Sequence, residues 1–270
     1  MNSNSDLPGS RLDNSAYLEE NNISKNQVAV EISKVFNQMI FGYETCGLHC
    51  DPHLGNVAIR TKPSCSNSSY NFEIILYDHG LYRQIPIDTQ RSYARLWLAI
   101  LKGDLPAMRK YSHIVAGIPE DKFPLFASAI TGRDFKVLAH SINTSKTEEE
   151  NSRMRQAVSG RLLGDLIQLL SDVPRLILLI LKTNDLMRAL DESLKATMVP
   201  ERNYFIIGKY CANCLYEEQL ESIKCFDKWR LISLWDFAKA WSEYNFTKLR
   251  LSILEICLTI QRTVLSVKVS

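Results

Sequence analysis

The sequence lacks any long hydrophobic run. A helix that crosses a bilayer needs about 18 to 20 consecutive apolar residues. The best candidate, residues 162–181, is interrupted by two aspartates, Pro174 and Arg175. The first 22 residues are rich in Ser, Asn and Asp, and their acidic residues argue against a secretory signal and against a basic transit peptide. We therefore expect neither a transmembrane span nor a targeting peptide in this chain.

A strong net charge is also absent. Lys and Arg together number 32 and Asp and Glu 30, which gives a net charge of +2. Without a basic field or an aromatic-basic stripe, nucleic acid is not an expected partner. The seven cysteines of the 270-residue chain are odd in number and irregularly spaced. They indicate reduced thiols rather than a disulfide framework.

The chain does contain a distinctive set of polar residues in the stretch 49–56, which reads H-C-D-P-H-L-G-N, and in D-H-G at 78–80. Asp51 lies five positions before Asn56, and Asp78 follows an apolar run. In phosphoryl-transfer enzymes an Asp at the first position serves the acceptor hydroxyl, while the Asn and the later Asp hold magnesium. Magnesium prefers such hard oxygen donors. The spacing predicts Asp51 as the catalytic aspartate and Asn56 and Asp78 as magnesium ligands.

The surrounding pattern predicts the elements that carry this motif. Apolar residues recur at helical spacing between about residues 25 and 43, which predicts a helix leading into the loop. Short strands are expected at 57–59 and 72–77, joined by a polar hairpin loop. Beyond residue 78 the pattern predicts successive helices, at about 88–103, 105–115, 123–130, 158–170 and 174–194. The expected fold class is mainly α (α+β), with a small β-hairpin beside the catalytic loop.

A metallohydrolase is the rival interpretation of the same residues. His49, Asp51 and His53 alternate in the way that metal ligands on a strand often do. Two observations argue against it. Pro52 interrupts the pairing of any strand that carries the three, and Asn56 and Asp78 are left without a role.

The loop 49–56 resembles the H-A-D-P-H-P-G-N loop of the UbiB/AarF-domain atypical kinases, also called the ABC-one family. Residues 76–82, which read L-Y-D-H-G-L-Y, resemble a variant of that family's metal motif found in its mitochondrial aarF-domain-containing branch. The resemblance covers about residues 26–197 well. Cys50 stands where the family usually has Ala and Leu54 where it usually has Pro, and neither substitution is expected to touch the metal chemistry.

This resemblance implies a protein-kinase-like fold that binds ATP and Mg²⁺, with ATPase or small-molecule or lipid kinase activity. It also implies a link to coenzyme Q and lipid homeostasis at the mitochondrial inner membrane, with a nucleotide and a lipid or membrane surface as partners. Asp51 and His49 are the expected catalytic residues, with His49 bracing the loop. Asn56, Asp78 and Gly80 form the expected cofactor site, with Gly80 permitting the bend after Asp78. The plainer alternative is that Asp78 and Gly80 only form a turn.

The elements of a kinase N-lobe are not found in the sequence. Such a lobe needs a strand-borne Lys, a helical Glu and a loop over the nucleotide, but the chain has no G-x-G-x-x-G and no K-x-G-Q. We therefore expect a C-lobe with its N-lobe absent, and little activity from this fragment alone. A truncated or mis-started gene product and a piece of a split gene, either with the N-lobe encoded upstream, are the favoured explanations. The alternative is a non-catalytic, pseudokinase-like binding or scaffold module. The expected organisation is a disordered segment over 1–24, a C-lobe over 25–197 and a helical extension over 198–270.

Two stretches allow two interpretations each. Residues 182–185, K-T-N-D, mix charge and amide within an apolar helix, so they either orient a site or are simply exposed. Residues 249–267 are amphipathic with flanking cations. They form either a helix packed on the lobe or a membrane-surface helix, and Glu255 and the small number of cations favour packing.

Overall fold

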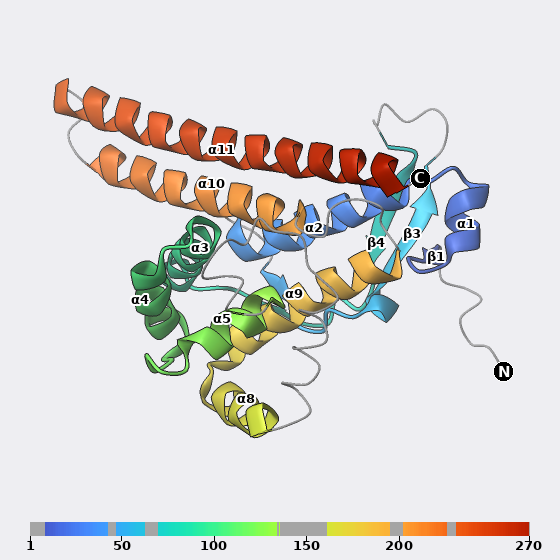
Figure 1. Ribbon diagram of the computed structural model, residues 1–270, viewed down its shortest axis with the longest axis horizontal. Helices are drawn as coiled ribbons and strands as arrows, with labels where there is room; N and C mark the ends of the chain where they lie inside the picture. The colour runs from blue at the N-terminus through green and yellow to red at the C-terminus, as the bar shows by residue number, and fades with distance from the viewer. Residues whose placement is uncertain are drawn as a thin grey trace.

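The computed structural model describes residues 9–42, 47–62, 70–133, 135, 161–194, 202–225 and 231–269. Its elements, in chain order, are β1 (Ser10–Arg11), α1 (Ser15–Glu20), α2 (Lys25–Phe41), β2 (Leu48–His49), the 3-10 turn η1 (Leu54–Asn56), β3 (Val57–Thr61), β4 (Phe72–Leu76), β5 (Tyr82–Arg83), α3 (Ile87–Lys102), α4 (Leu105–Ala116), α5 (Phe123–Thr131), α8 (Arg161–Asp172), α9 (Arg175–Ser193), α10 (Arg202–Cys225) and α11 (Leu231–Val269) (Figure 1). The fold is mainly helical with small antiparallel sheets, which confirms the predicted class.

The helix and the hairpin expected around the motif are both present. The Ser24 side chain caps α2 by accepting a hydrogen bond from the Gln27 backbone N–H, as is usual where a helix begins after Ser. β3 and β4 pair antiparallel, with Val57 opposite Leu76. Of the predicted hairpin loop, residues 63–69 lie outside the described residues. The hairpin therefore brings the end of the 49–56 loop close to the start of the D-H-G segment.

A second antiparallel pair was not predicted from the sequence. β2 and β5 pair with His49 opposite Tyr82. The chain thus enters the 49–56 loop from β2 and leaves it into β3, and it enters the 77–81 loop from β4 and leaves it into β5. Because β2 pairs with β5 and β3 with β4, both loops are held between the same two ladders.

The hydrophobic core has two parts. The larger lies among α3, α4, α5, α9 and α10, with Trp97, Tyr93 and Phe126 as its largest buried side chains. The smaller lies between α2 and the three-stranded sheet, where Phe36 and Ile59 are buried. α9 contributes to both parts, so it joins the helical body to the sheet that carries the site.

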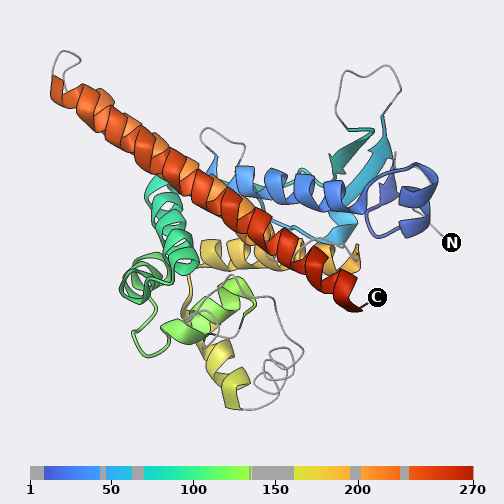
Figure 2. The ribbon, with the colours of Figure 1, turned by 45° about the horizontal axis from the view of Figure 1, so that its top comes forward.

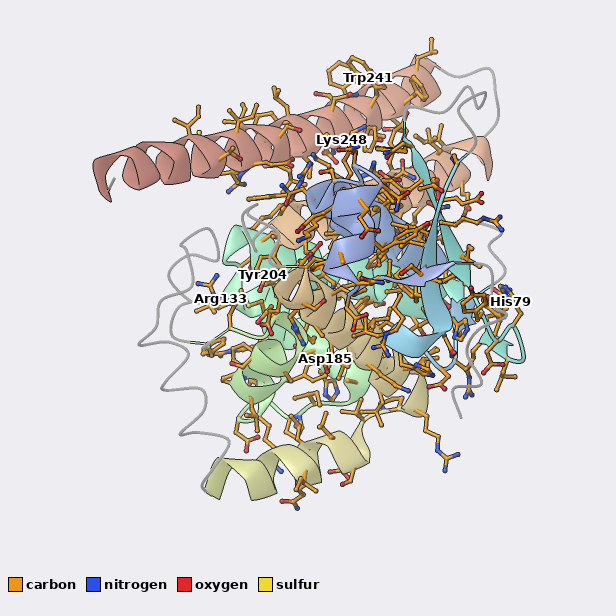
Figure 3. All side chains as sticks on the ribbon, turned by 90° about the vertical axis from the view of Figure 1, so that its right-hand side faces the viewer. His79, Arg133, Asp185, Tyr204, Trp241 and Lys248 are labelled. Carbon is orange, nitrogen blue, oxygen red and sulfur yellow. The ribbon has the colours of Figure 1, made fainter. Side chains whose placement is uncertain are left out.

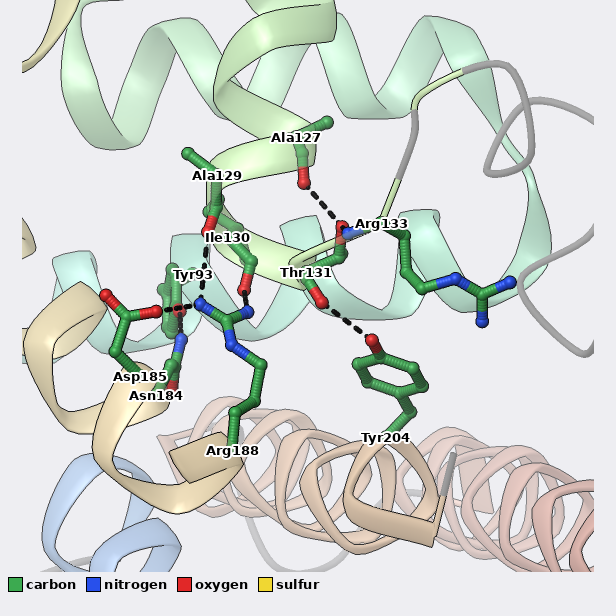
Figure 4. Close-up of polar contacts among 10 residues, drawn as sticks. All are labelled: Tyr93, Ala127, Ala129, Ile130, Thr131, Arg133, Asn184, Asp185, Arg188 and Tyr204. Carbon is green, nitrogen blue, oxygen red and sulfur yellow. Dashed lines mark hydrogen bonds and ion pairs between the residues drawn. The ribbon is translucent and has the colours of Figure 1, made fainter. Parts of the chain in front are cut away.

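Hydrogen bonds between helices fix α9 against its neighbours (Figure 4). The Arg188 guanidinium donates to the Ile130 carbonyl at the C-terminal end of α5 at 2.8 Å and pairs with Asp185. A cation there satisfies carbonyl groups that the helix leaves without partners. Asn184, which is buried, donates to the Tyr93 hydroxyl on α3 at 2.9 Å. These bonds hold α9 in one position relative to α3 and α5.

The prediction of disorder over residues 1–24 is wrong for residues 9–24. β1 pairs with β3 at the edge of the sheet, and α1 follows with the Asn14 side chain as its cap. Leu12 and Leu18 are almost fully buried in the smaller core. The polar composition misled the sequence analysis, because a few well-placed leucines are enough to pack a short segment onto an existing core.

Residues 198–270, which were expected to form a helical extension, contain two long helices, and α10 is part of the larger core. α10 and α11 run alongside each other (Figure 1), and in the turned view α11 lies over α10 (Figure 2). α10 packs into the larger core through Phe205 and Cys211, and Arg91 and Arg95 of α3 form further ion pairs with its Glu221 and Glu218. Among the described residues, no helix combines the length and the apolar composition needed to cross a membrane.

Replacing Leu18 with Ala should reduce the free energy of unfolding by about 2–5 kcal/mol, because it leaves a cavity in the smaller core. Urea unfolding measures this change. The matched control is Ile114→Ala on α4, whose side chain is exposed and whose loss should change stability by less than about 0.5 kcal/mol. Equal stabilities of Leu18→Ala and the unmodified chain would show that α1 is not packed on the core.

Candidate active site

The peptide of Tyr77 joins the two loops of the site. Its N–H donates to the Asn56 carbonyl at 2.8 Å, and its carbonyl accepts a hydrogen bond from His49 Nε2 at 3.2 Å. One residue is thus bound to both ends of the 49–56 loop. Because Asp78 follows Tyr77 directly, the position of its backbone relative to that loop is fixed.

His49 braces the loop from within the protein. It is buried, and its Nδ1 accepts a hydrogen bond from the Asp51 N–H at 3.0 Å. Nε2 must then carry the proton that it donates to the Tyr77 carbonyl. With both ring nitrogens engaged, His49 holds Asp51 in place and has no nitrogen left for a substrate or a metal.

Asn56 is oriented by its own loop. Its Nδ2 donates to the Asp51 carbonyl at 3.1 Å. The amide therefore has its oxygen, Oδ1, left as the atom that can bind a cation. The same hydrogen bond connects Asn56 to the residue expected to serve the acceptor hydroxyl.

Asp78 adopts the left-handed backbone conformation, with φ of 56°. Asp and Asn tolerate this region better than most residues, and strain of this kind gathers at functional sites. Gly80 was expected to permit the bend after Asp78, but the residue in the left-handed region is Asp78 itself. At Gly80 a Cβ atom would lie 3.1 Å from Asp78 Oδ1. The glycine therefore leaves room for the Asp78 carboxylate.

Asp51 is exposed at the surface of the site and has two charged or polar neighbours. Lys182 Nζ lies 2.7 Å from its Oδ1, and His53 Nε2 lies 3.3 Å from its Oδ2. The hydrogen bond from the Lys182 ammonium group lowers the pKa of the Asp51 carboxyl below its ordinary value. The carboxylate thus remains ionised to lower pH than that of an isolated aspartate.

Lys182 is a site residue that the sequence analysis did not assign. It lies on α9, 131 positions after Asp51. The mixed charge and amide of residues 182–185 indicate from the sequence a segment that can orient a site, but nothing in that pattern connects it with this loop. Within the segment only Lys182 reaches the loop, since Asn184 bonds α3 and Asp185 pairs with Arg188 on its own helix.

The D-H-G segment is supported by aromatic contacts. His79, which lies at the edge of the molecule (Figure 3), accepts or donates a hydrogen bond with the Tyr82 hydroxyl at 2.7 Å and stacks on its ring. Tyr82 in turn contacts the His49 ring edge-on. The Cys50 N–H also donates to the Leu81 carbonyl at 3.1 Å. The two loops are therefore joined along their length as well as at their ends.

The donor atoms fit a magnesium ion better than a transition metal. Asn56 Oδ1 and the Asp78 carboxylate are hard oxygen donors, and magnesium in nucleotide sites takes one or two such ligands together with phosphate oxygens. Among the described residues no group of three or more His, Cys, Asp or Glu side chains is arranged to hold a metal. The hydrogen bonds of His49 also remove it from the ligand set that the metallohydrolase interpretation requires.

Comparison with known proteins shows which family the chain resembles. Residues 6–112 match the model of the ABC1 atypical kinase-like domain. The chain is 44% identical over 231 residues to a Schizosaccharomyces pombe protein named ABC1 family protein MCP2 homolog, which covers 85% of this chain and 40% of that protein. Identity to the Saccharomyces cerevisiae ABC1 family protein MCP2 is also 44%, over 242 residues, or 88% of this chain and 42% of that one.

An animal relative extends the comparison. The AarF domain-containing protein kinase 1 of Gallus gallus is 37% identical over 191 residues, which are 70% of this chain and 35% of that protein. The chain thus spans well under half the length of these three relatives. No solved structure matches it.

Replacing Lys182 with Met removes the ammonium group but keeps most of the side chain. The pKa of Asp51 should then rise towards its ordinary value, so that the carboxylate becomes protonated at higher pH than in the unmodified chain. A ¹³C NMR titration of the aspartate carboxyl groups measures this, with Asp51→Asn identifying the signal.

The control for this titration is Lys102→Met, which removes a lysine at the end of α3 that has no role in the loop. It should leave the Asp51 titration unchanged. An identical Asp51 pKa in Lys182→Met and the unmodified chain would contradict the contact.

Proposed function

Because the chain belongs to the ABC1/AarF family of atypical kinase-like proteins, we propose that its two joined loops form the metal-binding and acceptor side of a phosphoryl-transfer site that uses ATP and Mg²⁺. The observation that carries the proposal is the double hydrogen bond of the Tyr77 peptide to His49 and Asn56. It places the backbone of Asp78 beside the loop that contains Asp51. The activity of the whole protein is part of the proposal, since the chain spans well under half of its relatives.

In this proposal each residue has a separate task. Asn56 and Asp78 hold the metal through oxygen atoms, and the ion neutralises charge on the nucleotide phosphates when bound. Asp51 orients the acceptor hydroxyl and takes its proton. His49, which was predicted among the catalytic residues, acts as a positioning residue because it reaches the site only through Asp51 and Tyr77.

Lys182 has a charge that suits the same site. In the structure its ammonium group binds Asp51, but both side chains are about half exposed. Exposed ion pairs contribute little to stability, so an anionic phosphate can replace the carboxylate as a partner at small cost. We propose that Lys182 stabilises charge on the transferred phosphoryl group, in the manner of lysines that bind phosphates in other transferases.

The sequence lacks segments that a kinase needs for fast ATP turnover. It contains no K-x-G-Q or G-x-G-x-x-G segment that would bind and cover the nucleotide phosphates. We therefore propose magnesium-dependent nucleotide binding with little turnover by the chain alone. The setting that we propose, from the family resemblance of the two motifs, is the mitochondrial inner membrane, with a link to coenzyme Q and lipid homeostasis.

The second candidate is a non-catalytic, pseudokinase-like binding or scaffold module. The observation that favours it is the long α10–α11 extension, which offers a large helical surface away from the loops (Figure 1). A scaffold has no need for an oriented Asn56 amide or for room beside the Asp78 carboxylate at Gly80. Nucleotide binding distinguishes the two candidates.

Replacing Asp78 with Asn should weaken Mg²⁺-dependent ATP binding by about tenfold or more, since even partners of metal ligands commonly contribute that much to metal affinity. Asn accepts the left-handed conformation of this position, so the fold should be unchanged. Isothermal titration calorimetry with ATP, with and without Mg²⁺, measures the effect.

The matched control is Asp121→Asn, the same chemical change at an exposed position between α4 and α5, which should bind as the unmodified chain does. If Asp78→Asn bound equally well, the proposed metal site would be wrong. If the unmodified chain failed to bind Mg²⁺·ATP and its melting temperature did not change, the scaffold candidate would be favoured.

A further inference from the structure

One face of α11 is firmly attached to α10. Ala240 and Leu251 are buried, and Leu251 lies against Gly208, where an added Cβ atom would be 3.0 Å from Leu251 Cδ1. The rings of Tyr216 and Tyr244 stack with centroids 4.5 Å apart. The position of α11 along α10 is therefore fixed by close packing.

Ion pairs add to this attachment. Glu255 accepts a hydrogen bond from Lys209 at 2.8 Å and lies 3.3 Å from Arg202. Glu243 accepts a hydrogen bond from Gln219. Two of the three acidic residues between positions 234 and 260 thus bond to α10, and of the three Glu243 and Asp236 are exposed.

The opposite face of α11 is apolar and exposed. We call it the outer face, and its nine large apolar side chains are between 45% and 73% exposed: Leu234, Trp235, Phe237, Trp241, Phe246, Leu249, Ile253, Ile256 and Ile260. Trp241 lies on the side of α11 away from the rest of the molecule (Figure 3). At about 100° of rotation per residue, seven of these positions lie within about 70° of the direction opposite Ala240 and Leu251. Phe237 and Trp241 extend the face around one side of the helix.

The extent of the outer face is unusual for a protein surface. The 27 positions from 234 to 260 span about 40 Å at 1.5 Å per residue. Isolated apolar side chains are normal on a surface, but a continuous row of this kind marks an interaction site. Its aromatic side chains belong to the first half, and the second half is purely aliphatic.

Cations lie at the edges of the outer face. Lys239 and Arg250 project from one edge and Lys248 from the other, by the same helical rotation, and all three are exposed. Lys248 also lies over the Tyr244 ring. Glu255 is paired with cations of α10, so the three exposed cations exceed the two exposed carboxylates, Asp236 and Glu243, by one positive charge.

We propose that the outer face of α11 binds the surface of a lipid bilayer that contains anionic phospholipids. An apolar helical face with Trp, Phe and Leu, bordered by Lys and Arg, is suited to lie in the bilayer interface. The long basic side chains at the edges can reach phosphate groups while their stems stay in the apolar layer. Anionic lipids attract such cations.

The charges argue against a second copy of the chain as the occupant. Two outer faces packed against each other would bring the three edge cations of one copy near those of the other, with only two exposed acidic side chains in each 234–260 segment, Asp236 and Glu243, to offset them. Like charges across an interface disfavour association. A lipid surface satisfies both the apolar row and its basic edges. The proposal is independent of nucleotide binding.

Flotation of the full chain with unilamellar vesicles tests the proposal. Vesicles of phosphatidylcholine with phosphatidylglycerol should bind the chain, and vesicles of phosphatidylcholine alone should bind it more weakly. The double variant Trp241→Asp, Ile253→Asp should lower the partition coefficient by about tenfold or more, because it places two carboxylates in the apolar layer. Lys239→Gln with Arg250→Gln should lower binding to the anionic vesicles only.

The matched control is Ile114→Asp with Ile167→Asp, which alters two exposed isoleucines on α4 and α8 and should leave partitioning unchanged. Circular dichroism verifies that each variant is folded. The proposal is overturned if the unmodified chain does not float with anionic vesicles, or if the outer-face variant floats as well as the control. It is also overturned if light scattering shows a dimer in lipid-free solution that Trp241→Asp, Ile253→Asp dissociates.

Discussion

The structure of the site depends on one peptide group. The N–H and the carbonyl of Tyr77 bind opposite ends of the 49–56 loop, through Asn56 and His49. Both contacts follow from the register of the neighbouring strands. Val57 pairs with Leu76 next to one contact, and His49 pairs with Tyr82 near the other. Loops are usually the most variable parts of a fold. Here two loops that carry the polar chemistry are restrained at both ends by two small ladders.

A second constraint acts from the helical body. α9 is fixed by bonds from Asn184 to α3 and from Arg188 to α5, and it brings Lys182 to Asp51. The buried bonds set the position of the helix, whereas the exposed ion pair that results from it is free to exchange partners. This combination suits a phosphoryl-transfer site. The Lys182 ammonium group is held close to the position of a transferred phosphate, but it is not locked in its ion pair with Asp51.

Much of the fold could be predicted because its elements have local signals. The helical spacing before the loop, the β-branched run before Asp78 and the glycines after α3, α4 and α5 each mark an element or its end. The candidate site residues were also found locally, because Asp51 and Asn56 share one loop and Asp78 ends one strand.

The remainder depends on contacts between distant residues. Nothing near Lys182 indicates that it meets Asp51, and nothing near Leu12 or Leu18 indicates that a core lies beside them. The amphipathic pattern of 249–267 was interpreted as packing or membrane contact, but it belongs to one long helix with two apolar faces. One face packs on α10 and the other is exposed, a distinction that no single-helix pattern contains.

The central claim is that Asn56 and Asp78 bind the same metal ion. It is tested most directly by the anomalous scattering of manganese in crystals of the chain with Mn²⁺ and a non-hydrolysable ATP analogue. The account predicts one peak within about 2.2 Å of both Asn56 Oδ1 and an Asp78 carboxylate oxygen. An ordered nucleotide whose manganese ion is bound elsewhere, or saturating Mn²⁺ with no peak at these two atoms, would contradict it.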